Sequence, residues 1–202
     1  MAKFTLRIEH DPDVECPCEN DGSWKLYSFD PRHTNYRELS EFVISRQGRK
    51  SRYITGANIG IQRKLAVGTA FILSCYEHSG ISYSLKGEGM QCQWDTTGMA
   101  GILVWEERPE YMGAKNYVDR AQDARNFLEE YNHWVNGHCY CYDIEKMETC
   151  PTCKHEHGEA VDSCVGFIGW DYLKQELMSE HPELFVPDVE LEVTGDAAWI
   201  ME

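Results

Sequence analysis

Hydrophobic and polar residues alternate along several short segments of the chain, a pattern typical of β-strands with one buried face. In KFTLRIEH (3–10), Phe4, Leu6 and Ile8 fall on one side and charged or polar residues on the other. Further strands are predicted at 65–76, 81–85 and 101–107. The first of these three is a continuous apolar run, which is typical of a strand that is buried on both faces.

A second group of strands is predicted near the C-terminus. HCYCYDIE (138–145) alternates, and AVDSCVGFIG (160–169) follows as its return strand. These two segments form a predicted β-hairpin, and ETCPTCKHEHGE (148–159) lies at its tip. The segment VELEV (189–193), in the acidic tail 179–202, is a candidate edge strand.

The clearest helix is predicted at about 114–135. Its apolar residues recur at spacings of three or four, and Asn136-Gly137 supplies a stop signal. Shorter helices are predicted at 34–44 and 170–178. Because the strands precede and follow one long helix and short turns join the late strands, the pattern predicts an α+β fold. We expect a mainly antiparallel sheet in a single domain over residues 1–202.

The formal net charge is −15, and it is unevenly distributed along the chain. Residues 1–64 have a net charge of +2, whereas residues 65–202 have a net charge of −17. An acidic surface repels nucleic-acid phosphates and attracts proteins that bind nucleic acids. The alternative interpretation is that the acidic residues only keep the protein soluble.

The nine cysteines indicate reduced thiols or metal ligands rather than disulfides. The chain opens on a charged, alternating segment, and its longest apolar run is shorter than a membrane span, so we expect a cytoplasmic protein. Isolated cysteines in apolar surroundings behave as small buried hydrophobic residues. We therefore expect Cys75, Cys92 and Cys164 to be buried.

The hairpin tip contains four candidate zinc ligands, Cys150, Cys153, His155 and His157. The C-x-x-C spacing lets both thiolates bind one ion, and the two histidines lie on one side of an extended chain. A structural zinc ion is expected, because an exposed tip offers no cleft for a catalytic site. The alternatives are a more distant fourth ligand or a polar tip with incidental thiols.

The segment 45–64 has six basic residues and no acidic residue. Its candidate phosphate-binding residues are Arg46, Arg49, Lys50 and Arg52. Tyr53 is its only aromatic residue, so it lacks the stacking residues of a single-strand platform. The segment is therefore either a nucleic-acid contact or a surface loop or hairpin that balances the acidic remainder.

The region from about 80 to 172 resembles a set of small accessory proteins of tailed bacteriophages. The resemblance is carried by ISYSLKGEGMQCQWDTTGMAGILVW, by YNHWVNG at the end of the long helix, by HCYCYDIE and above all by VDSCVGFIGWD. This family has no assigned activity, so no functional residue is carried over. The resemblance implies a phage protein that acts in the cytoplasm of a bacterial host.

Together these features predict a non-enzymatic protein that binds a basic host protein. An inhibitor of a nucleic-acid-targeting defence, such as a CRISPR or restriction complex, fits the charge best. The candidate acidic contacts are Glu106, Glu107, Glu110, Glu129, Glu130, Glu190 and Glu192. The first alternative is a zinc-stabilised nucleic-acid-binding or regulatory module that uses 45–64, and the second is a zinc-dependent enzyme.

Overall fold

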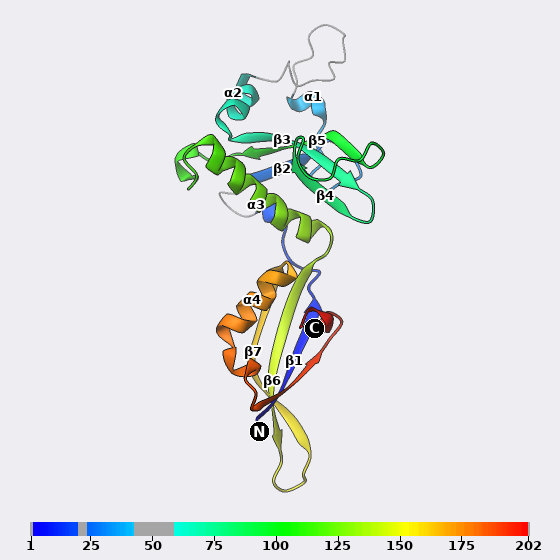
Figure 1. Cartoon of the computed structure of the whole chain (residues 1–202), viewed down its shortest axis with the longest axis vertical. Coiled ribbons are helices and arrows are strands. Elements are labelled where there is room, and N and C mark those ends of the chain that lie inside the picture. Colours follow the sequence, from blue (N-terminus) through cyan, green and yellow to red (C-terminus); the bar gives the residue numbers. More distant parts are fainter. Residues whose placement is uncertain (1, 20–23, 43–58, 202) are drawn as a thin grey trace. The chain divides into compact units, whose positions relative to one another are not determined.

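The computed structural model describes residues 2–19, 24–42 and 59–201. The chain forms two compact units, each with its own four-stranded sheet (Figure 1). Unit 1 consists of Met1–Glu15 and His133–Glu202, and unit 2 consists of Cys16–Asn132. The α+β class and the mainly antiparallel pairing are confirmed. Folding as a single domain stays a prediction, because the grouping into units does not decide whether both unfold together.

The sheet of unit 1 has the strand order β7-β6-β1-β8. Its strands are β1 (Ala2–His10), β6 (Cys139–Thr149), β7 (Glu156–Ile168) and β8 (Val189–Thr194). β1 pairs antiparallel with β6 and parallel with β8, so the first strand of the chain is an inner strand. β6 and β7 form the predicted hairpin, which has two register shifts.

One face of this sheet carries the core of unit 1. The alternating residues Leu6 and Ile8 of β1 and Ile144 of β6 are at most 1% exposed. They pack with Leu173 and Leu177 of α4 (Trp170–Glu180), which are one helical turn apart. Two short 3-10 helices, η3 (Pro182–Phe185) and η4 (Ala198–Met201), complete this side.

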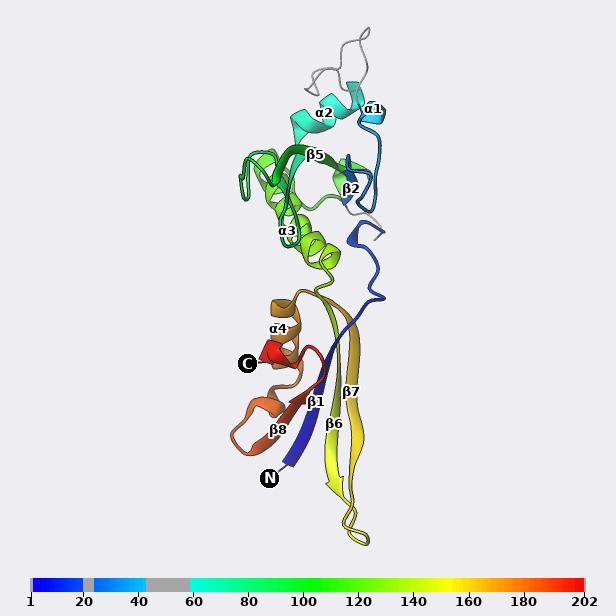
Figure 2. The ribbon, with the colours of Figure 1, turned by 90° about the vertical axis from the view of Figure 1, so that its right-hand side faces the viewer.

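The opposite face of the sheet carries the polar residues of the same alternation. Figure 2 shows α4 and the C-terminal segment on one side of the sheet, and no described element of unit 1 on the other. We call this other side the open face. It is formed by Lys3, Thr5, Arg7 and Glu9 of β1, Asp143 and Glu145 of β6, and Glu190 and Glu192 of β8.

The sheet of unit 2 has the order β2-β5-β3-β4 and is antiparallel throughout. Its strands are β2 (Trp24–Ser28), β3 (Ala70–Glu77), β4 (Ile81–Leu85) and β5 (Thr96–Trp105). The α-helices of this unit are α1 (Leu39–Phe42), α2 (Ile59–Val67) and α3 (Tyr117–Val135). The last residues of α3 belong to unit 1. Two short 3-10 helices are η1 (Pro17–Glu19) and η2 (Pro109–Tyr111).

Both faces of the unit 2 sheet are covered. Ring contacts join one face to α3: Phe71 lies 5.6 Å from Tyr117, and Tyr83 lies 5.9 Å from Tyr131, between centroids. On the other face, buried Ala70, Ile102 and Val104 pack against Phe42 of α1 and against Ile61 and Leu65 of α2.

Several element boundaries differ from the prediction. The apolar run 65–76 is divided, because 65–67 ends α2 and the strand begins at Ala70. Of the helix predicted at 34–44, only Leu39–Phe42 is helical within the described residues. Strand β2 was not predicted. The long helix, the late hairpin, the helix after it and the edge strand β8 are confirmed.

Cys75 is buried, as predicted, and Cys92 is partly buried. The prediction that Cys164 is buried was wrong, because β7 is an edge strand whose residues 156–166 are all exposed. None of the helices in the described part of the chain combines the length and the apolar content that a membrane crossing requires.

Candidate functional site

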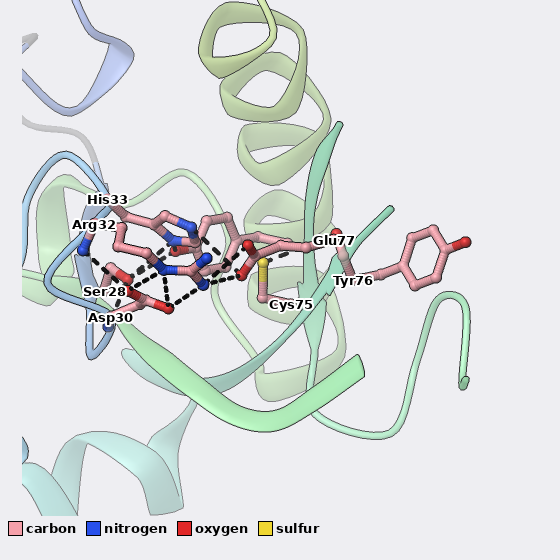
Figure 3. Close-up of polar contacts among 8 residues, drawn as sticks. Ser28, Asp30, Arg32, His33, Cys75, Tyr76 and Glu77 are labelled. Carbon is pink, nitrogen blue, oxygen red and sulfur yellow. Dashed lines mark hydrogen bonds and ion pairs between the residues drawn. The ribbon is translucent and has the colours of Figure 1, made fainter. Parts of the chain in front are cut away.

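A cluster of polar side chains lies at the end of β3 in unit 2 (Figure 3). Cys75 and Glu77 are two residues apart on this strand, so their side chains project from the same face. His33, from the turn that follows β2, lies against them, whereas Tyr76 points away. The cluster therefore joins two segments that are far apart in the sequence.

Hydrogen bonds fix the imidazole of His33. Its Nε2 lies 3.4 Å from Oε1 of Glu77. Its Nδ1 lies 2.6 Å from the hydroxyl of Tyr83 and 3.3 Å from Oγ of Ser28. The two hydroxyl groups are themselves 2.8 Å apart. Both ring nitrogens are thus occupied, and the ring has little rotational freedom.

Arg32 supplies the positive charge of this cluster. Its guanidinium contacts Oδ2 of Asp30 at 2.6 Å and Oε2 of Glu77 at 3.1 Å. The side-chain and backbone hydrogen bonds from Arg32 lower the pKa of Asp30. Burial, together with the charge of Glu77, raises the pKa of Cys75 to about 12, so the free side chain is a neutral thiol.

The accessibility of these groups limits their chemistry. Ser28, His33 and Glu77 are the residue types of a hydrolase triad, but the Ser28 side chain is fully buried. Cys75 is 1% exposed, so neither nucleophile is accessible to a substrate. A metal ion could still be bound, because ligand atoms of His33, Cys75 and Glu77 all lie within 4.8 Å of one another. The cluster is therefore compatible with a metal ion such as zinc.

The predicted zinc tip connects β6 to β7. Backbone hydrogen bonds from Cys150 N to His155 O and from Lys154 N to Cys150 O close the turn, at 2.9 Å each. N–H groups of Cys153 and Thr152 and the thiol of Cys153 lower the pKa of Cys150. The two cysteines are therefore neighbours, as the C-x-x-C spacing predicts.

The histidines of the tip do not join this cysteine pair. His157 lies opposite Glu148 in the ladder between β6 and β7. Among the residues that the structure describes, no three of the four predicted tip ligands lie as close together as His33, Cys75 and Glu77 do. Zinc binding at the tip stays a prediction.

The seven predicted acidic contacts are distributed over both units. Glu106, Glu107, Glu110, Glu129 and Glu130 belong to unit 2. Glu190 and Glu192 belong to unit 1, where they are exposed at alternate positions of β8. The structure therefore places only these last two on the open face.

The open face contains further acidic residues that sequence reasoning missed. In the strand register, Thr5 lies between Glu145 and Glu192, and Arg7 lies between Asp143 and Thr194. Neighbouring strands are about 4.8 Å apart, so Glu145 and Glu192 flank β1 at a spacing of roughly 10 Å. The sequence signal that could have placed Asp143 and Glu145 on this face was their alternation with the apolar residues Tyr142 and Ile144.

The cations of the open face are already paired. Lys3 contacts Glu156 at 3.2 Å, and Nε of Arg7 donates to Glu9 at 2.9 Å. In the described part of the chain, none of Asp143, Glu145, Glu190 and Glu192 takes part in an ion pair. These four carboxylates therefore give the open face its net negative charge.

A hollow of about 550 Å³ lies on the open face. Side chains of β1, β6 and β7 line it, including those of Thr5, Asp143, Glu145 and Ser163. Asp143 and Glu145 are both exposed. Arg7 and Asp162 also line the hollow, and the guanidinium of Arg7 is paired with Glu9. The carboxylates of Asp143 and Glu145 suit a cationic side chain.

Nearly all the net negative charge of the protein belongs to unit 1. Unit 1 contains 5 Lys/Arg and 19 Asp/Glu, a formal net charge of −14, against −15 for the whole chain. Unit 2 is therefore close to neutral, although the sequence boundary at residue 64 suggested a different division. The two ends of the chain fold together, and this could not be read from the order of charges.

Two other segments singled out in the sequence, the basic segment 45–64 and Asp162-Ser163-Cys164, add little to the candidate sites. Arg46, Arg49, Lys50 and Arg52 lie outside the described residues. In the segment Asp162-Ser163-Cys164, Asp162 contacts His181 at 2.9 Å, and hydrogen bonds from His181 and Tyr142 lower its pKa. This contact ties β7 to the end of α4.

No family model, no curated protein and no solved structure matches this chain. The fold and the sites define it as an α+β protein with an acidic sheet face and a partly buried His–Cys–Glu cluster.

Proposed function

We propose that this protein is a non-enzymatic accessory protein of a tailed bacteriophage that binds a basic host protein through the open face. The partner is a nucleic-acid-binding component of a host defence, such as a CRISPR or restriction complex. The observation that carries the proposal is the concentration of the net charge in unit 1, with four carboxylates on the open face that form no ion pair with any described residue.

The open face occupies the partner's nucleic-acid site by matching its charge. Asp143, Glu145, Glu190 and Glu192 present carboxylates to Lys and Arg side chains that otherwise bind phosphates. Strands hold these carboxylates at fixed spacings, so little conformational entropy is lost on binding. The hollow beside Asp143 and Glu145 receives one long basic side chain of the partner.

The test uses labelled DNA bound to purified defence effectors, including a CRISPR effector complex and a restriction endonuclease. We expect the wild-type protein to release DNA from a susceptible effector. The open-face variant carries Asp143→Asn, Glu145→Gln, Glu190→Gln and Glu192→Gln. Its inhibition constant is expected to rise about 100-fold, because four charge pairs at the interface are lost. Inhibition by the wild type should also weaken steeply with added salt.

A matched control removes the same number of charges from unit 2, by Glu106→Gln, Glu107→Gln, Glu110→Gln and Glu129→Gln. These residues were predicted contacts, so the comparison decides between the two surfaces. A larger loss of inhibition in the control variant would show that the binding surface lies on unit 2. Inhibition that persisted unchanged in high salt would contradict charge matching altogether.

We also propose that the tip of the β6–β7 hairpin binds a structural zinc ion through Cys150 and Cys153, and that the tip rearranges to bring His155 and His157 to the ion. The neighbouring thiols support this, since C-x-x-C pairs are common zinc ligands. Cys150→Ser/Cys153→Ser is expected to lower the zinc content of the purified protein by one ion per chain, measured by elemental analysis. Unchanged zinc content would contradict a site at the tip.

A further inference from the structure

The side chains of His33, Cys75 and Glu77 offer nitrogen, sulfur and oxygen ligands from two different segments of unit 2. Their ligand atoms lie within 4.8 Å of one another. His33 and Cys75 are almost completely buried, with exposed fractions of 7% for the histidine side chain and 1% for the cysteine. Glu77 is 31% exposed, so the cluster reaches solvent on the side of its carboxylate.

We propose that His33, Cys75 and Glu77 bind a zinc ion, with water as the fourth ligand on the side of Glu77. This site is separate from the hairpin tip and does not depend on the binding function of the open face. The ion joins the turn after β2 to the end of β3, so its removal is expected to destabilise unit 2.

The distances in the cluster suit zinc. Two ligands bound tetrahedrally at about 2.1 Å from one ion are roughly 3.4 Å apart. Nε2 of His33 and Oε1 of Glu77 are separated by 3.4 Å. A sulfur ligand bound at about 2.3 Å lies roughly 3.6 Å from the nitrogen. Since the ligand atoms lie within 4.8 Å of one another, the thiolate of Cys75 completes the site with a shift of up to about 1.2 Å, within the reach of a side-chain rotation.

The surroundings of the three ligands are those of a metal site. When zinc binds Nε2, the imidazole proton resides on Nδ1, which faces the oxygen atoms of Tyr83 and Ser28 at 2.6 and 3.3 Å. Such a hydrogen bond orients most zinc-bound histidines. Arg32 holds the second carboxylate oxygen of Glu77 at 3.1 Å. The hydrogen bonds that would orient the histidine and the carboxylate ligands are thus already present.

The ligand types select the metal. A thiolate and an imidazole favour zinc over magnesium or calcium, which prefer oxygen ligands. Binding releases the thiol proton of Cys75 to solvent, and the sulfur then bonds to the ion. Zinc needs no redox partner, so the reduced thiol is the only form required.

The experiment uses the full chain with Cys150→Ser/Cys153→Ser, so that the tip contributes no cysteine ligand. Cobalt(II) replaces zinc as a probe, because cysteine ligation adds a thiolate-to-cobalt absorption band in the near ultraviolet. We expect one cobalt per chain with this band, displaced by zinc. Chelation should lower the Tm by about 5–10 °C, since the ion binds only the folded chain. A chain without the band and without bound zinc would overturn the proposal.

Two further substitutions locate the site. Cys75→Ala in the same background should abolish the thiolate band and weaken zinc binding at least 100-fold. Glu77→Gln, at a position where the side chain is 31% exposed, should weaken it about 10- to 100-fold. Far-UV circular dichroism checks that each variant is folded. If Cys75→Ala does not fold, the zinc affinity of Glu77→Gln decides whether the cluster binds zinc. Zinc affinity that is unchanged in the folded variant would overturn the proposal.

Discussion

Replacing Gly195 by alanine is expected to destabilise unit 1 by about 4 kcal/mol, a large part of the stability of a typical domain. Gly195 follows β8 with a φ of +98°, a conformation that L side chains rarely adopt. A Cβ at this position would collide with the carbonyl oxygen of Ile8. Ile8 is fully buried, and its carbonyl accepts a hydrogen bond from Ala197 N–H at 3.1 Å. Neither partner can move without disturbing the core.

The matched control is Gly166→Ala. Gly166 has a similar φ of +85°, but a Cβ there would meet nothing within 4 Å. Its substitution is expected to cost only the backbone strain, about 1–2 kcal/mol. Urea denaturation followed by circular dichroism gives both free energies of unfolding, and amide exchange assigns the loss to unit 1. Equal destabilisation by the two substitutions would mean that the contact with Ile8 does not limit position 195.

Replacing Trp24 by alanine is expected to destabilise unit 2 by about 3–5 kcal/mol. Trp24 is 2% exposed and packs edge-on against Trp105, with ring centroids 5.5 Å apart. Its Nε1–H also donates to Asp123 of α3 at 3.0 Å. The substitution therefore removes a large buried ring and a bond between β2 and α3.

Trp94 provides the control, because its side chain is 87% exposed. We expect Trp94→Ala to change the free energy of unfolding by less than about 0.5 kcal/mol. Urea midpoints measured by circular dichroism avoid a signal that depends on tryptophan itself. Similar midpoints for the two variants would show that Trp24 is not a central core residue.

Local patterns predicted the elements that are long or strongly periodic. The 19-residue helix α3 repeats its apolar positions through five turns, and β6 alternates buried and exposed residues over its first half. β2 has only five residues, so its alternation of buried Trp24 and Leu26 was too short to identify it. The division into two sheets depends on long-range pairing, which no local pattern encodes.

The candidate sites show the same limit. The predicted strand 65–76 ended one residue before Glu77, whereas β3 includes it and so places Cys75 and Glu77 on one face. Nothing near them in sequence points to His33. Asp143 and Glu145 were assignable to the side opposite Tyr142 and Ile144. Whether that side is covered depends on where α4 packs, which is decided by the tertiary structure.

The inner position of β1 has a consequence for the order of folding during synthesis. This strand is made before all of unit 2's strands, yet its neighbours β6 and β8 follow those strands in the sequence. Unit 2 is continuous in sequence, so all its strands have emerged while β1 still lacks both partners. β1 therefore lacks its native strand partners until β6 has been made. Its alternating charged residues keep it soluble during this interval, before Phe4, Leu6 and Ile8 find their core.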